Sequence, residues 1–116
     1  MASRIDIDRR VPDVAILALV GEHETFSAPD IERELDSAIA DGSAVIVDLT
    51  RTEFIDSSVV TVLLRARDEA QRRGVRLGLV IDDSTGWSVR QLLELTGLVS
   101  VFPIADSRDD AIAGAV

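Results

Sequence analysis

Residues 44–74 read AVIVDLTRTEFIDSSVVTVLLRARDEAQRRG, and this stretch decides the fold. It opens at 44–49 with an apolar run that does not alternate, which is typical of a strand covered on both faces. Asp56-Ser57 then offers a helix N-cap, and Gly74 after two arginines is a helix stop. The residues between form one apolar helical stripe: Val59, Val62, Leu63, Ala66 and Ala70. Although several of them are β-branched, which favours a strand, the stripe and its caps predict a buried strand followed by a helix of about five turns.

Upstream of this stretch, the sequence predicts two strands and a helix. Residues 4–9 alternate in polarity, as an edge strand does, and residues 13–20 form a buried run that Gly21 closes. The two strands are expected to pair. A helix is predicted to start at Ser27, a good N-cap, and to end at Asp41.

Downstream, the pattern predicts two further strands and two helices. Residues 75–81 are the next strand, and a helix capped at Ser84-Thr85 follows and stops at Gly97. Residues 98–104 are predicted as a short last strand, and residues 106–116 as a C-terminal helix.

The predicted order of elements is β-β-α-β-α-β-α-β-α, which is typical of an α/β domain. It implies one mixed, mostly parallel sheet whose helices are carried by short right-handed crossovers. A chain of 116 residues has room for one domain, so residues 1–116 are expected to form it. The 47% of hydrophobic residues suffices for its core.

The residue types that are missing exclude several chemistries. There is no cysteine, which excludes disulfides and thiolate sites, and the single histidine, His23, cannot build a zinc site by itself. All basic residues are arginine, so Schiff-base and P-loop lysine chemistry are excluded as well. We therefore expect no metal and no cofactor.

The net charge of −9 indicates which partners suit the chain. Nucleic acid is a poor partner, since binding phosphates needs a basic face, and the four aromatic residues are scattered along the sequence. A protein with a basic surface suits it better. No apolar run approaches the ~20 residues that cross a bilayer, and the first ten residues are too charged for a signal peptide. We expect a cytoplasmic protein without direct membrane insertion.

Two loops that follow predicted strands carry the candidate functional residues, because partners usually bind at the edge where such strands end. The first loop spans residues 21–26 and the second spans residues 52–58. Together they supply the candidate partner-binding residues Glu22, His23, Glu24, Glu53, Asp56, Ser57, Ser58 and Val59.

An enzymatic role is not expected at these loops. Ser57 has only His23 as a conceivable base, and no third residue is placed by motif to orient it. Asp48, at the end of a strand, suggests a phospho-aspartate receiver, but a receiver needs a lysine that this chain lacks.

These segments resemble the STAS domain (sulphate transporter and anti-sigma factor antagonist). The residues that carry the resemblance are 45–58 with the Asp-Ser-Ser segment, followed by Leu63-Leu-Arg-Ala66, and Gly21-Glu-His-Glu24 with Ala28-Pro29. Gly74-Val-Arg-Leu and residues 92–98 resemble later parts of the family, so nearly the whole chain is covered. The resemblance implies a STAS-like single domain that acts as an anti-sigma factor antagonist.

In such proteins the serine directly after the aspartate, here Ser57, is phosphorylated by a kinase-type anti-sigma factor. The unmodified protein binds that partner and releases a sigma factor, and a phosphatase resets the switch. Two features differ from the usual family pattern: Val59 and Val60 stand where glycine commonly follows the serines, and Glu24 replaces an aspartate.

Other interpretations remain open at this point. Ser57 is otherwise a simple N-cap worth about 1 kcal/mol, His23 a surface loop residue, and Trp87 a helix-packing residue rather than a partner contact. STAS-like chains also serve, without phosphorylation, as scaffold modules of stress-signalling assemblies or as accessory subunits of membrane transporters.

Overall fold

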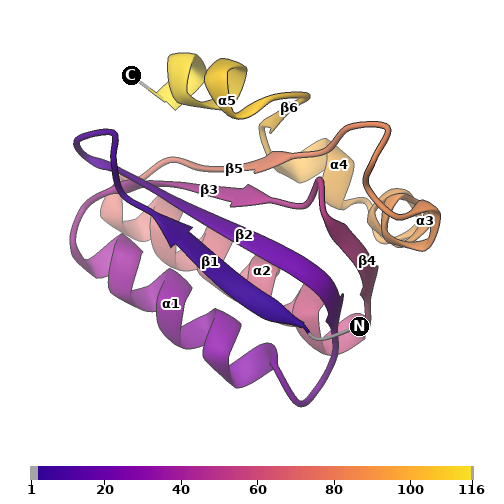
Figure 1. Cartoon of the computed structure of the whole chain (residues 1–116). Helices are drawn as coiled ribbons and strands as arrows, with labels where there is room; N and C mark the ends of the chain where they lie inside the picture. Colours follow the sequence, from indigo (N-terminus) through magenta and orange to yellow (C-terminus); the bar gives the residue numbers. More distant parts are fainter. Residues whose placement is uncertain (1–2, 116) are drawn as a thin grey trace.

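The computed structural model describes residues 3–115, which form one sheet with helices on both of its faces (Figure 1). The strands are β1 (Arg4–Asp8), β2 (Val14–His23), β3 (Ala44–Asp48), β4 (Thr52–Ile55), β5 (Leu77–Val80) and β6 (Ile104–Ala105). The helices are α1 (Ala28–Ala40), α2 (Ser57–Arg73), α3 (Trp87–Leu95), α4 (Leu98–Val101) and α5 (Arg108–Ala115). Val116, which the sequence places in the last helix, lies outside the described residues.

The sheet is mixed and mostly parallel, as predicted. Its strand order is β1-β2-β3-β5-β6, with β4 also paired to β2. The β1 edge strand is antiparallel to β2, and the remaining pairs are parallel. The ends of β2, β3 and β5 therefore meet at one edge of the sheet, where α1, α2 and α3 begin.

Two apolar layers explain why the central strands do not alternate. Leu17, Val47 and Leu79 belong to the main core with α1 and α2, while Ile16 and Ile46 face the other side. There they meet α5 through Ala111 and Ile112. Figure 1 shows α1 and α2 on one side of the sheet and α5 on the other. Strands covered on both faces gain nothing from polar alternation.

The prediction of a closing strand at residues 98–104 is wrong for most of these residues. Gly97 adopts φ 77° and ends α3, and the chain then turns into the short helix α4. Leu98 and Phe102, four positions apart, are both buried, whereas Val99 and Val101 are exposed. This spacing buries one helical face, so only Ile104 and Ala105 remain to pair as β6.

The expected end of β2 at Gly21 is also wrong, as is the assignment of residues 52–58 to a loop. Gly21 adopts φ 86° at a register shift, and beyond it β2 leaves β3 and pairs with β4. The Gly21 N–H donates to the Arg51 carbonyl at 3.0 Å, and the buried Thr52 hydroxyl donates to the Leu19 carbonyl. A strand of four residues has too short a pattern to be found from sequence.

The start of α3 differs from its predicted cap. The helix begins at Trp87 with Gly86 as N-cap, one or two residues later than expected. Ser84 and Thr85 instead close a turn on Asp82: the Asp82 N–H donates to the Thr85 hydroxyl at 3.2 Å, and the Ser84 N–H donates to the Asp82 carboxylate at 2.8 Å.

An ion pair fastens α5 to the sheet. Arg108 Nε donates to the carboxylate of Asp48 at 2.7 Å, and a second contact of 3.5 Å joins Arg108 to Asp8. Asp48 is only 4% exposed. Its carboxylate thus has a structural partner from the C-terminal helix.

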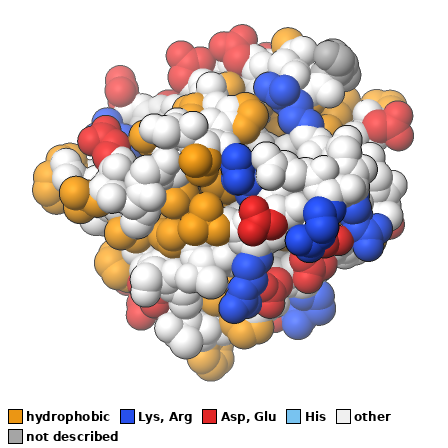
Figure 2. All heavy atoms as spheres, turned by 180° about the vertical axis from the view of Figure 1, so that it is seen from behind, with side chains coloured by type: hydrophobic (Ala, Val, Ile, Leu, Met, Phe, Trp, Pro, Cys, Tyr) orange, Lys and Arg blue, Asp and Glu red, His pale blue; other side chains and the backbone are white. Residues whose placement is uncertain are grey.

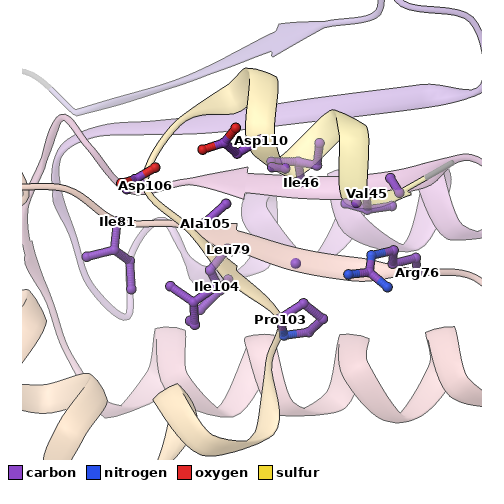
Figure 3. Close-up of a pocket in the computed structure, with 14 residues that line it drawn as sticks. Val45, Ile46, Arg76, Leu79, Ile81, Pro103, Ile104, Ala105, Asp106 and Asp110 are labelled. Atoms are coloured by element: carbon purple, nitrogen blue, oxygen red, sulfur yellow. The ribbon is translucent and has the colours of Figure 1, made fainter.

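A half-open cavity of about 560 Å³ lies beneath α5 (Figure 3). Its floor is apolar, and Arg76 lies at one end while Asp106 and Asp110 lie toward the other. Small residues of α5, among them Ala111 and Gly114, form part of its lining. It lies on the face of the sheet opposite to α1 and α2.

Candidate functional site

Ser57 is the first residue of α2 and is exposed, as the sequence predicted. The helix follows directly on β4, so Ser57 lies where that strand reaches the edge of the sheet. Within residues 3–115, its hydroxyl makes no hydrogen bond. The hydroxyl is therefore accessible to a partner or to a phosphate donor.

Asp56, rather than Ser57, caps α2. Its carboxylate accepts from the N–H groups of Ser58 at 3.0 Å and Val59 at 3.3 Å, and from the Ser58 hydroxyl. The Ser58 hydroxyl, with the backbone N–H groups of Val59, Thr25 and Ser58, holds the pKa of Asp56 below its ordinary value against the opposing effect of burial. The carboxylate is therefore ionised at neutral pH, and Ser57 is not needed as a cap.

The same carboxylate joins the first loop to the second. The N–H and the hydroxyl of Thr25 donate to Asp56 at 3.1 and 3.3 Å, across 31 positions of sequence. Thr25 was not among the predicted site residues, because nothing in its own neighbourhood indicates this contact. The hydrogen bonds bring Glu24 and Thr25 beside the start of α2.

His23 is not a surface loop residue, and the expectation from sequence is wrong. Its side chain is 1% exposed, at the end of β2. Nε2 lies 3.1 Å from the Val20 carbonyl, and Nδ1 lies 3.1 Å from the Ser27 hydroxyl. Because a carbonyl only accepts, Nε2 donates its hydrogen to Val20.

The buried His23 ring shapes the loop that contacts Asp56. Ser27 occupies the N-cap position of α1, but its side chain makes no capping hydrogen bond. Its hydroxyl instead accepts from the Glu24 N–H at 3.2 Å and lies against His23. The His23 side chain thus supports the loop from beneath the surface.

The predicted site residues fall into three groups. Glu22, Glu24, Glu53 and Ser57 are exposed. Asp56 and Ser58 are half-buried and hydrogen-bonded to each other. Val59 and His23 lie in the interior, so their side chains are not exposed at the surface as a contact with a partner requires.

A shallow groove of about 360 Å³ opens beside Ser58, between the N-terminal halves of α1 and α2. It is lined by Thr25, Pro29 and Thr61. Arg65 and Glu32, which also line it, form an ion pair of 3.3 Å. A partner that contacts Ser57 has room here for a side chain.

The comparisons with known proteins agree with this geometry. The family model described as the STAS domain matches residues 7–111. The chain belongs to the STAS domain family. Among the described residues of this STAS domain, no helix is both long and apolar enough to cross a bilayer.

Two curated relatives of this STAS domain carry names of regulators. The anti-sigma-F factor antagonist RsfB of Mycobacterium tuberculosis is 30% identical over 102 residues, which are 87% of this chain and 80% of RsfB. BtrV of Bordetella bronchiseptica, named as a proposed anti-sigma factor antagonist, is 31% identical over 105 residues, which are 90% of this chain and 88% of BtrV. Such proteins regulate by binding another protein, which agrees with the expectation that this chain is not an enzyme.

Solved structures of the same class share the fold. An anti-sigma factor antagonist from Mycobacterium paratuberculosis superposes with a TM-score of 0.84 at 24% identity, covering 98% of this chain and 94% of that one. The anti-sigma factor antagonist SpoIIAA in its unphosphorylated form gives a TM-score of 0.72 at 18% identity, with 96% of each chain covered. The phosphorylated Bacillus SpoIIAA gives 0.74 at 21% identity, covering 97% of this chain and 100% of that one.

Proposed function

We propose that this STAS domain is an anti-sigma factor antagonist that binds a kinase-type anti-sigma factor through the surface around Ser57. Phosphorylation of Ser57 by that partner switches the binding off. The observation that carries the proposal is the accessible Ser57 hydroxyl at the first residue of α2, beside an ionised Asp56. A phosphatase that resets the switch and a cytoplasmic location belong to the same proposal.

The electrostatics of the site support a switch driven by charge. A phosphate on Ser57 adds about −1.5 to −2 charges, and the N-terminus of α2 tolerates them. The neighbouring Asp56 and Glu53 are acidic, and so is the chain as a whole, with a net charge of −9. A dianion beside these carboxylates raises the desolvation cost of docking, and it removes the free Ser57 hydroxyl as a hydrogen-bond donor to the partner. A loss of about 2.7 kcal/mol weakens binding about a hundredfold.

The geometry removes one obstacle that the sequence raises. Val59 stands where glycine is common in the family, and a bulky residue at the surface would obstruct a partner's backbone. Its side chain points into the core and is fully buried, and that of Val60 is 7% exposed. Neither side chain therefore blocks access to the Ser57 hydroxyl.

The test uses the purified cognate anti-sigma factor of the same organism and titration calorimetry. Wild type and Ser57→Ala should bind alike, whereas Ser57→Asp should bind at least tenfold more weakly. Incubation with the partner and ATP should add one phosphate to wild type and none to Ser57→Ala, as the mass of the intact protein reports.

A matched control separates the effect of position from that of charge. Ser37→Asp adds the same charge on the exposed face of α1, nine residues and so about 14 Å along that helix from its first residue. It should bind like wild type. A wild type that gains no phosphate, together with a Ser57→Asp variant that binds with full affinity, would leave the alternative of a STAS scaffold or accessory subunit with an idle serine.

A further inference from the structure

Two exposed aromatic residues that are far apart in the sequence lie on adjacent elements, β4 and α3. Trp87, the first residue of α3, is 70% exposed, and Phe54 in β4 is 38% exposed. The expectation that Trp87 packs its helix against the core is wrong. An exposed tryptophan held at the start of a helix needs another explanation.

Close backbone packing fixes the start of α3 against β4. The Gly86 N–H donates to the Thr52 carbonyl at 2.8 Å, and the Ser88 hydroxyl donates to the Glu53 carbonyl at 3.2 Å. A Cβ on Gly86 would lie only 2.5 Å from that same carbonyl oxygen, so α3 touches β4 directly at this point. Phe54 follows Glu53, and Trp87 follows Gly86. The contact between these two backbone segments therefore places both aromatic residues on touching elements.

The aromatic pair is continuous with the Ser57 surface. β4 ends at Ile55, and Asp56 and Ser57 follow it directly. On the neighbouring strand, Glu22 lies opposite Phe54 in the register of β2 and β4. Ser57, β4 and the start of α3 are therefore neighbours, and we refer to their exposed residues together with Glu22 as the strip: Ser57, Phe54, Glu53, Glu22 and Trp87.

The chemistry of this strip fits a basic protein. It combines two exposed carboxylates, Glu22 and Glu53, with the two aromatic residues. Tryptophan faces attract arginine and lysine side chains, and buried aromatic residues supply much of the binding energy of protein interfaces. A second copy of this chain would bring the same negative charges against the strip, which disfavours self-association.

We infer that Trp87 and Phe54 form a second anchor for the anti-sigma factor that binds at Ser57, with Trp87 as its main contact. The inference rests on the proposed function. It assigns binding to residues outside the phosphorylated segment, so the partner contacts β4 and the start of α3 in addition to the start of α2.

The chain offers a direct probe, because Trp87 is its single tryptophan. Incorporation of 5-fluorotryptophan into this chain alone gives one ¹⁹F resonance, whatever tryptophans the partner has. Titration with the unlabelled anti-sigma factor should shift that resonance and reduce the solvent exposure of the fluorine atom. An unchanged resonance at saturation, with binding confirmed by calorimetry, would overturn the inference.

Variants give the second line of the test. Trp87→Ala should weaken binding at least tenfold, and Phe54→Ala should weaken it less, since the phenylalanine is less exposed. Leu95→Ala is the matched control, because Leu95 is 81% exposed on the same helix but at its other end. It should bind like wild type. Thermal unfolding of each variant establishes that the fold is kept.

The outcomes separate this inference from the proposed function. If Ser57→Asp weakens binding and Trp87→Ala does not, the second anchor is refuted and the switch stands. If wild type does not bind the cognate anti-sigma factor, the proposed function fails first. A ¹⁹F shift that depends on protein concentration without any partner would identify the strip as a contact between two copies, which also refutes the inference.

Discussion

The substitution Asp56→Ala should destabilise the fold by about 2 kcal/mol at pH 7. It removes the N-cap of α2, which is worth about 1 kcal/mol, and the hydrogen bonds from Thr25, whose net contribution is also about 1 kcal/mol. The substituted residue is half-buried, so solvent replaces part of what is lost. For a domain of this size the midpoint of thermal unfolding should fall by roughly 6–10 °C.

The pH dependence of this loss has a definite sign. Hydrogen bonding lowers the pKa of Asp56 in the folded state. Its contribution is therefore fully present above the ordinary aspartate value of about 3.9 and disappears as the pH falls through the folded pKa. The difference in the free energy of unfolding between wild type and Asp56→Ala should shrink toward the acid end.

Urea unfolding followed by far-ultraviolet circular dichroism measures the effect, since the exposed Trp87 is a poor fluorescence reporter of folding. Asp56→Asn keeps an acceptor and should lose less than alanine does, without the pH dependence. Asp83→Ala is the control. The Asp83 side chain is exposed and its carboxylate accepts no hydrogen bond within residues 3–115, so the substitution should change the free energy of unfolding by less than about 0.5 kcal/mol. A loss at Asp56 no greater than at Asp83 would refute the assignment of the cap and the loop contact.

Three further substitutions test other parts of the structure. Gly86→Ala should destabilise by about 1–3 kcal/mol, because the new methyl group collides with the Glu53 backbone, and differential scanning calorimetry should show it. Asp36→Asn should stabilise by up to about 0.5 kcal/mol at pH 7. Partial burial and two nearby glutamates raise the pKa of Asp36 in the folded state. The stabilisation by the protonated side chain is therefore fully present below its unfolded pKa, and it is lost as the pH rises through the folded pKa. The gain from asparagine should be absent at pH 3 in urea titrations. Arg108→Ala should cost about 2–3 kcal/mol, as it leaves the buried Asp48 carboxylate without its cation, and addition of Asp48→Asn should recover part of this in a double-mutant cycle.

The prediction of Ser57 at a helix start succeeded because its determinants are local. The cap at Asp56 and the stripe from Val59 to Ala70 lie within one helix, and the buried run of β3 needs no partner to be visible in the sequence. The same reasoning placed α1 and the β1–β2 pair. Caps, apolar periodicity and turn residues act between near neighbours, so the sequence carries them directly.

Contacts between distant segments lay beyond this reasoning. The strand β4 forms because β2 changes its pairing partner at Gly21. The helix α4 forms because Leu98 and Phe102 are both buried in the main core. The wrong expectations for His23 and Trp87 have the same origin, since burial depends on what covers a side chain and not on its neighbours in sequence.

By itself, the sequence determined the α/β class, the run of major helices and strands, and a serine presented at the mouth of α2. Only the tertiary structure decided how that serine is surrounded: Asp56 held by Thr25 from the other loop, and the start of α3 packed against Glu53 of β4. The physical reason is that these arrangements depend on the sheet bringing its strand ends to one edge. Each contact joins residues about thirty positions apart, and neither partner shows any sign of the other in its own stretch of sequence.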